Sequence, residues 1–589
     1  MLAAAIAAHQ AGKMAEAEQQ YRDFLQQQPQ HADACALLGT VVGARGDFAE
    51  AIVWVDKAIA IDPASGLLHF HRGTVLMAAQ KLSEAIAAFT RAAELQPNVP
   101  QIHFNFANAL RAVDDWPGAI THYRESIKLD PNFLAAYNNL ALSLVHEEHY
   151  KEAFHLASRT VALDASYGDG WLTLCNVAEK IRDYETALTA GERAVALIPD
   201  NHFAWFGYGV ALNRLNRDEE AIEAYQKALQ LNPARADICD NLAQSYQALN
   251  RLEEAEAAFR EAIKIDKQEI AGDGAREIDE AEYGHRHWHL ALIELLCGDY
   301  KTGFARYRAR MKAIPELKRP DLPFPLWKGE DLRGKTILVG DEQGFGDTLM
   351  LARFLPMLRV IGSKIFFRVQ KPLKTLFDVS GMADEVIAHG DKIPLCDFFC
   401  SSFDLPHRLG ITLKNLPNAT PYLPVLPPDA DTLLPCDARK KIGIVWGGSP
   451  LHKADAKRSI PLPLVGDLFS VPNTQFYSFN RDFKPGDEER LKNYPIENLA
   501  PRLTDFAVAA RLIGQMDLVI SCDTATAHLA GALGKKTWVL LPFAPDWRWL
   551  TGHDDNPWYP TMRLFRQPKA EDWQRVIEDV RMALAKEFA

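Results

Sequence analysis

The stretch VISCDTATAHLAGALGKKTWVLLPF, residues 519–543, encloses a short polar segment between two apolar runs. The apolar runs have the length and composition of buried strands, and the segment between them is typical of a helix. A strand, a helix and a second strand make up the basic unit of a parallel sheet. Ligands of such sheets bind beyond the carboxyl ends of the strands. We therefore expect the polar residues DTATAH, which follow the first strand, to contact a ligand.

The same alternation of strands and helices extends over the C-terminal half of the chain. TILVG, KIFFRVQ and DEVIAHG alternate with amphipathic segments, and a second series starts with KKIGIVWGG and continues with TQFYSFN and DLVISCD. The proline-rich stretch NLPNATPYLPVLPPDADTLLP separates the two series. This pattern predicts an α/β fold of two Rossmann-like domains, residues 335–428 and 429–589, that face a cleft.

The N-terminal half repeats with a period of 34 residues. Prolines, alanines, small residues and aromatic residues each recur at their own position of the period, as expected for helix-turn-helix repeats whose helices approach closely at small side chains. The positions are Pro29, Pro63, Pro97, Pro131, Pro199 and Pro233; Ala17, Ala51, Ala85, Ala119, Ala153, Ala187, Ala221 and Ala255; Gly39, Gly73, Ala107, Ala141, Gly209 and Ala243; and Phe89, Tyr123, Tyr225 and Phe259.

This pattern resembles the tetratricopeptide repeat over residues 1–269. Stacked repeats of this kind form an α-solenoid with a concave groove, which usually holds a peptide. A further helix pair, HRHWHLALIELLCGDYKTGFARYRARM, predicts a cap of the solenoid over residues 270–313. The proline-rich stretch after it predicts a linker over residues 314–334.

Asn105, Asn139 and Asn241 recur at one position of the repeat, on the first helix of their units. In the tetratricopeptide family this position lines the concave side. An amide side chain there offers a donor and an acceptor to the backbone of a bound peptide. Two interpretations stay open: the three asparagines bind a peptide, or they are solvated polar positions.

Composition excludes several classes of protein. The net charge is -12, so nonspecific binding of nucleic acid is not expected. The longest apolar runs are far shorter than the roughly 20 residues that cross a bilayer. No membrane span is therefore expected. The N-terminus lacks the basic start and the longer apolar run of an export signal. Eight scattered cysteines indicate reduced thiols and a cytoplasmic protein.

The loop GDEQGFGDT, residues 340–348, follows the first strand of the C-terminal half. Gly344 and Gly346 lack the third glycine of a dinucleotide fingerprint, and no Gly-Lys-Ser/Thr follows them. The sequence therefore disfavours an NAD enzyme and a P-loop ATPase. The two glycines still allow a backbone to pass close to a ligand, and Asp347 is placed at the start of the next helix, where helix capping is the alternative role.

Three motifs together carry a second resemblance. GFGDTLMLARFLPML, IVWGGSP with KRSIPL, and DTATAHLAGALG are similar to glycosyltransferase family 9, which contains the bacterial heptosyltransferases and has the GT-B arrangement of two Rossmann-like domains. The resemblance covers roughly residues 335–585. Joined to tetratricopeptide repeats, the architecture is also similar to the O-GlcNAc transferases.

This resemblance implies a nucleotide-sugar site and a catalytic base. In the family, the loop that matches DTATAH holds the donor diphosphate on main-chain amides at a helix N-terminus, which suits an anion. The resemblance implies that Arg458, beside Lys457, neutralises phosphate, that Ser449 donates a further hydrogen bond, and that Asp347 is the general base. The implied donor site comprises Gly344, Gly346, Ser449, Arg458, Asp523, Thr524, Ala525 and His528.

No metal or other cofactor is expected. Asp429 and Asp431 form the DxD sequence of metal-dependent transferases, but they lie in the proline-rich stretch between the domains. Arg458 and helix amides are available for the leaving group instead. Trp547 and Trp549, in PDWRWL, either stack on a bound base or sugar, or plug the hinge between the domains.

The sequence therefore predicts an inverting glycosyltransferase that moves a sugar from a nucleotide-diphosphate donor to a protein acceptor held by the repeats. Two alternatives stay open. In one, the chain is a repeat scaffold whose transferase half only binds or assembles. In the other, the chain is a transferase that acts on lipopolysaccharide, a function that leaves the repeats unexplained.

Overall fold

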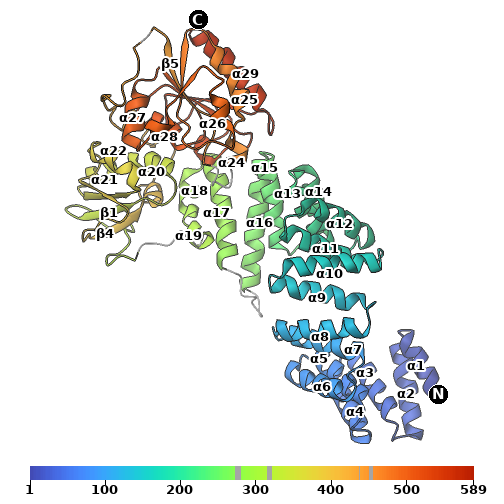
Figure 1. Cartoon of the computed structure of the whole chain (residues 1–589). Coiled ribbons are helices and arrows are strands. Elements are labelled where there is room, and N and C mark those ends of the chain that lie inside the picture. The colour runs from blue at the N-terminus through green and yellow to red at the C-terminus, as the bar shows by residue number, and fades with distance from the viewer. Residues whose placement is uncertain (272–279, 315–316, 318–320, 437, 450–454, 589) are drawn as a thin grey trace. The chain divides into compact units, whose positions relative to one another are not determined.

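The computed structural model describes the chain except for residues 272–279, 315–316, 318–320, 437, 450–454 and 589. Parts of the predicted cap and linker therefore lie outside the described residues. The chain forms two compact units, Met1–Pro233 and Ala234–Ala589, whose elements are labelled in Figure 1.

The first unit consists of helices that pair in sequence order. Each pair is joined by a short turn, as the 34-residue period predicts. The helices are α1 (Leu2–Gln10), α2 (Met14–Gln27), α3 (Ala32–Ala44), α4 (Phe48–Ile61), α5 (Gly66–Ala78), α6 (Leu82–Leu95), α7 (Pro100–Arg111), α8 (Trp116–Leu129), α9 (Leu134–His146), α10 (Tyr150–Leu163), α11 (Gly168–Lys180), α12 (Tyr184–Leu197), α13 (His202–Arg214) and α14 (Asp218–Leu231).

Small residues of one helix face large residues of its partner, as the sequence predicts. A Cβ atom added at Gly73 would lie 2.6 Å from the ring of Phe89, and one added at Gly209 would lie 2.6 Å from the ring of Tyr225. Both aromatic rings are fully buried. The repeated glycine is thus required by the ring that occupies the same space.

The turns inside the helix pairs carry a second periodic feature that the sequence analysis missed. One residue in each of these turns has a positive φ, a left-handed conformation that favours glycine. Only the first two turns have glycine there. The residues are Gly12, Gly46, Gln80, Asp114, Glu148, Arg182, Asn216 and Asn250, spaced by 34.

The second unit begins with the last repeat helices and continues into an α/β region. Its helices are α15 (Ala236–Ala248), α16 (Leu252–Ala271), α17 (Glu280–Leu296), α18 (Tyr300–Tyr307), α19 (Arg310–Ala313), α20 (Phe345–Leu351), α21 (Leu355–Ile361), α22 (Lys374–Asp378), α23 (Leu405–Arg408), α24 (Asp455–Arg458), α25 (Leu462–Gly466), α26 (Asp487–Leu491), α27 (Phe506–Gly514), α28 (Ala525–Ala532) and α29 (Trp573–Glu587).

Two parallel sheets form the α/β region and confirm the predicted fold class. The first has the strand order β3-β2-β1-β4, and the second has the order β10-β9-β8-β5-β6-β7. The strands are β1 (Thr336–Gly340), β2 (Lys364–Val369), β3 (Glu385–Ala388), β4 (Phe398–Ser401), β5 (Lys440–Val445), β6 (Thr474–Ser478), β7 (Ile496–Asn498), β8 (Leu518–Cys522), β9 (Thr537–Leu541) and β10 (Met562–Arg566).

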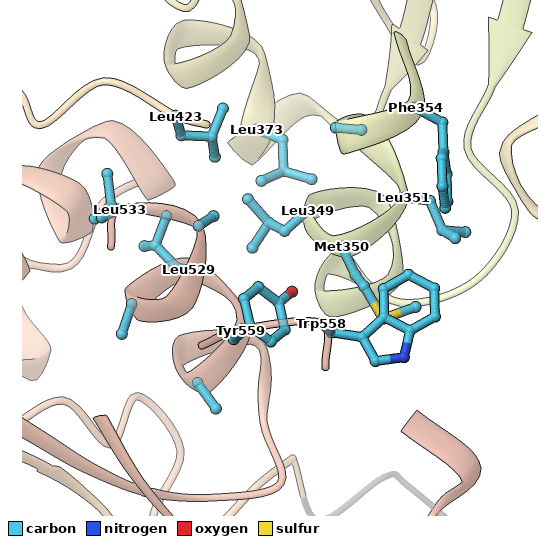
Figure 2. Close-up of a cluster of buried hydrophobic side chains, with 14 of the residues drawn as sticks. Leu349, Met350, Leu351, Phe354, Leu373, Leu423, Leu529, Leu533, Trp558 and Tyr559 are labelled. Carbon is cyan, nitrogen blue, oxygen red and sulfur yellow. The ribbon is translucent and has the colours of Figure 1, made fainter. Parts of the chain in front are cut away.

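One hydrophobic cluster contains residues from the domains of both sheets. Figure 2 shows Leu349 of α20 and Leu529 of α28 in this cluster, together with Trp558 and Tyr559. Since α20 follows β1 and α28 follows β8, the cluster brings the carboxyl ends of these two strands together. Burial of this apolar surface stabilises the arrangement of the cleft.

The helix pair α17–α18 packs into the same core as the sheets. Tyr300, Phe304 and Tyr307 of α18 are buried in one cluster with Trp547 and Trp558, which follow β9. This helix pair, predicted as a cap, therefore contributes side chains to the interior of the α/β region. Within the described residues, the structure has no helix long and apolar enough to cross a bilayer.

Candidate functional site

A cavity of about 980 Å³ lies at the carboxyl ends of the strands. Loops that follow β1, β5, β6, β8 and β9 line it, so both sheets contribute. Parallel sheets collect the loops of several strands at this edge. The cavity gathers all of the residues assigned by sequence to the donor site and the catalytic base.

The DTATAH loop connects β8 to α28 on one wall of the cavity. Thr524 is the N-cap residue of α28, and its hydroxyl lies 3.0 Å from the hydroxyl of Ser521. The first N–H groups of a helix have no partner within the helix, and they carry partial positive charge. Asp523 and Ala525 are partly exposed at this wall. The wall therefore offers backbone donors to an anion.

Although Asp523 as a whole is partly exposed, its carboxyl group is shielded from water by the surrounding protein, which disfavours the charged form and raises the pKa. The nearby carboxylate of Asp546 raises the pKa further. Arg548 and Arg458 oppose this shift. The carboxyl group thus belongs to a charged cluster that surrounds the helix N-terminus, and its charge depends on the neighbouring arginines.

His528 is buried and fixed by its neighbours. Its Nδ1 lies 3.0 Å from the hydroxyl of Tyr559, and its ring stacks on Trp549 at 5.3 Å. A Cβ atom at Gly346 would lie 2.7 Å from its ring, so the glycine gives the histidine room. Burial, together with Arg548 and Arg353, holds the pKa of His528 well below its ordinary value. The lowered pKa favours the neutral imidazole, and the ring lies against Gly346 of the first-sheet wall.

Basic residues approach the DTATAH loop from the second sheet. The Arg458 guanidinium donates to the carbonyl of Asp523 at 3.0 Å, and its Nε lies 3.4 Å from Asp455. Lys457 and Ser449 are exposed on the same side of the cavity. Arg481, at the end of β6, lines the cavity and has no hydrogen bond or ion pair to another described residue.

The glycine-rich loop forms the opposite wall. Gly344 is the N-cap residue of α20, and its N–H donates to Oδ2 of Asp347 at 3.0 Å. The other oxygen of Asp347 accepts a hydrogen bond from Arg548. Asp347 thus lies in the third position of the helix, and both of its carboxylate oxygens have a partner from the protein.

Arg548 is a residue of the site that the sequence analysis did not assign. Its guanidinium donates to Asp546 at 2.5 Å and to Asp347, so it joins a loop of the second sheet to a loop of the first. Its neighbours Trp547 and Trp549 are buried, 2% and 0% exposed, and therefore do not stack on a ligand. Neither tryptophan lines the cavity, and their role as a plug of the hinge between the domains stays a prediction.

The three repeat asparagines are divided between the two compact units. Asn105 and Asn139 belong to the first unit and Asn241 belongs to the second. Each is partly exposed, and each amide nitrogen already donates within the protein: Asn105 to the carbonyl of Gln101, Asn139 to Asn108 and Asn241 to the carbonyl of Asp237. Their carboxamide oxygens have no hydrogen bond to another described residue.

Asp429 and Asp431 lie away from the cavity. Asp429 accepts a hydrogen bond from the hydroxyl of Thr432 at 2.6 Å and pairs with Arg511 at 3.3 Å. The carbonyl of Asp431 accepts from Arg502. Both aspartates therefore organise the stretch between the domains.

Comparisons with known families agree with this architecture. Residues 2–66 and 172–236, 107–145 and 236–269 match descriptions of the tetratricopeptide repeat. Residues 487–541 match glycosyltransferase family 9 (heptosyltransferase). The chain thus combines segments that match the tetratricopeptide repeat with one segment that matches glycosyltransferase family 9. That segment contains β8, the DTATAH loop and β9, but it does not reach Asp347, Ser449 or Arg458.

Among curated proteins, Protein FlbA of Caulobacter vibrioides is 27% identical over 331 residues, which are 51% of this chain and 54% of FlbA. The chain thus spans about half the length of this relative. Two solved structures are also similar. YrrB, a tetratricopeptide protein with an unusual peptide-binding site, is 28% identical over 30% of this chain and 92% of its own, with a TM-score of 0.27. PilF of Pseudomonas aeruginosa is 19% identical over 37% and 96%, with a TM-score of 0.33.

Proposed function

We propose that this chain is an inverting glycosyltransferase, which moves a sugar from a nucleoside-diphosphate donor to a hydroxyl of a protein acceptor held by the repeats. The observation that carries the proposal is the composition of the cavity. Its second-sheet wall combines the N-terminus of α28 with Arg458, Lys457 and Arg481, and its first-sheet wall carries Asp347.

The second-sheet wall suits a diphosphate. Guanidinium and ammonium groups form charge-assisted hydrogen bonds to phosphate oxygens, and a helix N-terminus adds unpaired N–H groups. Lys457 and Arg481 have no hydrogen bond or ion pair to another described residue, so they are available to an anion. These positive groups stabilise the leaving nucleoside diphosphate, and the proposed reaction therefore uses no metal.

Asp347 is the proposed general base. The acceptor oxygen forms a bond to the anomeric carbon while the bond from that carbon to the phosphate oxygen breaks. Asp347 takes the hydroxyl proton, and the nucleoside diphosphate leaves with the electron pair. Attack from the face opposite the leaving group inverts the anomeric centre. An ionised carboxylate has about four acceptor positions, so the bonds from Gly344 and Arg548 leave positions for the acceptor hydroxyl.

The acceptor is proposed to be a protein because repeats of this kind usually bind peptides. The carboxamide oxygens of Asn105 and Asn139 are the proposed contacts in the first unit, and that of Asn241 is the proposed contact in the second; the protein already binds their amide nitrogens. A side chain that is fixed before binding loses less conformational entropy when the peptide arrives.

The test is a thermal-shift screen with ADP, UDP, GDP and CDP on the wild type and on Arg458→Ala. A ligand at about 100 times its dissociation constant stabilises the protein by about 2.7 kcal/mol. We expect one nucleotide to raise the melting temperature of the wild type, with a loss of about 1.5–3 kcal/mol of binding free energy in the variant. Arg333→Ala is the matched control, since Arg333 pairs with Asp331 on the surface and does not line the cavity.

A shift with one nucleotide that persists in Arg333→Ala and is lost in Arg458→Ala supports the donor site. The corresponding nucleotide sugars are then assayed for turnover with the wild type and Asp347→Asn. A well-folded wild type that responds to none of the four nucleotides contradicts the transferase proposal.

The second candidate function is a scaffold that binds a nucleotide without transferring a sugar. The observation that favours it is the occupation of both Asp347 oxygens by Gly344 and Arg548. The two candidates differ in turnover. Nucleotide binding without consumption of the matching nucleotide sugar, and without any effect of Asp347→Asn, would favour the scaffold.

A further inference from the structure

One face of α18 contacts residues that adjoin both walls of the cavity. Tyr300, Phe304 and Tyr307 are spaced by four and three residues, so they project from the same side of the helix. All three are 1–2% exposed. We call them the aromatic face of α18. This face contacts the loop that carries Asp347. It also contacts Trp558, whose neighbour Tyr559 is within hydrogen-bond distance of His528.

Tyr307 contacts the loop that carries Asp347. The amide of Gln343 donates to the Tyr307 hydroxyl at 3.0 Å. Gln343 directly precedes Gly344, whose N–H holds the carboxylate of Asp347. The path from the helix to the carboxylate therefore consists of two hydrogen bonds joined by one backbone step.

Arg310, in the next helix, holds the same loop. It is fully buried and donates to Glu342 at 2.5 and 2.6 Å and to Asp404 at 3.0 Å. Ser401 also donates to Glu342. The loop is thus fixed by a buried ionic network that starts in the helical segment before the sheets.

Tyr300 contacts the other wall. The indole of Trp558 donates to the Tyr300 hydroxyl at 2.6 Å. Tyr559, the next residue, lies 3.0 Å from Nδ1 of His528 at the DTATAH loop. Figure 2 shows Trp558 and Tyr559 side by side with α20 and α28. Phe304 lies between these two contacts along the helix and packs on Trp547 at 5.7 Å, next to Arg548.

We propose that the aromatic face of α18 positions the two walls of the site through separate contacts: Tyr307 positions Asp347, and Tyr300 positions His528 and the start of α28. The inference rests on the proposed function, because the two walls are assigned there to chemistry and to donor binding. Tyr300 and Tyr307 are positioning residues, since each acts through another residue.

Ion pairs also connect α18 to the last repeat. Glu294 of α17, 2% exposed, pairs with Arg260 of α16 at 3.3 Å and with Arg306 of α18 at 2.9 Å. A buried carboxylate with two partners fixes the three helices relative to one another. Glu294 therefore links the last repeat helix to the helix that carries the aromatic face.

The test compares Tyr307→Phe with Tyr300→Phe in the full chain. Each substitution removes one hydroxyl and keeps the ring, so the packing of α18 is retained. Tyr283→Phe on α17 is the control, because its hydroxyl has no hydrogen bond to another described residue.

Amide hydrogen exchange reads the positioning directly and needs no substrate. We expect Tyr307→Phe to accelerate exchange in residues 341–348 and to leave residues 523–532 unchanged. Tyr300→Phe should accelerate exchange in residues 523–532 and 556–560 only. Equal acceleration in both regions, or none in either variant, overturns the inference whatever the wild type binds.

Kinetics give the functional consequence. Loss of one hydrogen bond corresponds to about a 3-fold to 10-fold change. We expect Tyr307→Phe to lower kcat by this factor with the donor KM unchanged, and Tyr300→Phe to raise the donor KM. A wild type that binds no nucleotide contradicts the proposed function, whereas an active wild type whose two variants change the same constant contradicts the positioning roles.

Discussion

The repeats of the first unit and the α/β region of the second are stabilised over different distances along the chain. In the repeats, Gly209 faces Tyr225 and Gly73 faces Phe89, each pair 16 residues apart. In the second unit, Arg310 forms an ion pair with Asp404, 94 residues away in the sequence. The Trp558 indole donates a hydrogen bond to Tyr300, 258 residues away. Close pairs recur and are visible as a period, whereas distant pairs occur once and leave no pattern.

The comparison also separates two kinds of interior. The buried residues of the repeats are mostly small or aromatic and apolar, whereas the α/β region buries charged groups beside its cavity. Replacement of a buried side chain in a repeat should therefore lower the folding stability through lost packing contacts. Damage to the α/β region should cost more, because it leaves buried charge without a partner.

The largest expected effect is that of Arg310→Met. Removal of this fully buried guanidinium leaves Glu342 and Asp404 without their cation, which should cost about 3–5 kcal/mol. Denaturant unfolding should show an earlier transition of the second unit and an unchanged first unit. Arg333→Met, which breaks an exposed ion pair, is the control and should leave both transitions in place. An unchanged unfolding transition in Arg310→Met would show that the ionic network contributes no net stability.

A pair of glycine substitutions tests the repeats. Gly209→Ala puts a Cβ atom 2.6 Å from the Tyr225 ring and should cost about 1–3 kcal/mol. Gly43→Ala, where the nearest atom lies 3.5 Å away, should stabilise its helix by roughly 0.5 kcal/mol because alanine favours a helix. The two melting temperatures should move in opposite directions. Equal shifts would show that the contact with Tyr225 does not select the glycine.

The pH dependence of stability in the second unit should report the burial of His528. The pKa of His528 is lowered in the folded state, so below about pH 6.5 only the unfolded state takes up the proton. Stability is therefore lost as the pH falls, by at most about 1.4 kcal/mol per pH unit. His528→Gln should make the transition of the second unit less sensitive between pH 7 and 5.5. An identical pH response in wild type and variant would mean that folding does not lower the pKa of His528.

The smallest expected effect concerns the left-handed turns. Glu148 has a φ of 60°, which glycine adopts without strain. Glu148→Gly should therefore stabilise the first unit by about 0.5–1 kcal/mol. The reverse change, Gly46→Glu at a φ of 97°, should destabilise it. Thermal melts of the two variants test this, and a destabilised Glu148→Gly would indicate that the side chain makes a compensating contact.

The sequence predicted part of the candidate site. DTATAH, Arg458 and Asp347 could be placed at the cavity because strand patterns, a family resemblance and the strand-end rule agreed on them. Arg481 was missed although it follows the strand TQFYS, so the same rule would have found it. Arg548 had a weaker signal, since it stands between two tryptophans in PDWRWL and does not directly follow a strand.

Sequence alone determined the elements that short-range physics controls. The 34-residue period, the glycine that faces an aromatic ring and the alternation of strands with helices all arise from residues near one another in the chain. They determined the repeats and the two parallel sheets. Only the tertiary structure decided that α18 packs in one core with the sheets, that Arg548 pairs with Asp347 across 201 residues and that burial lowers the pKa of His528. Such contacts depend on loop closure and burial, which no local pattern records.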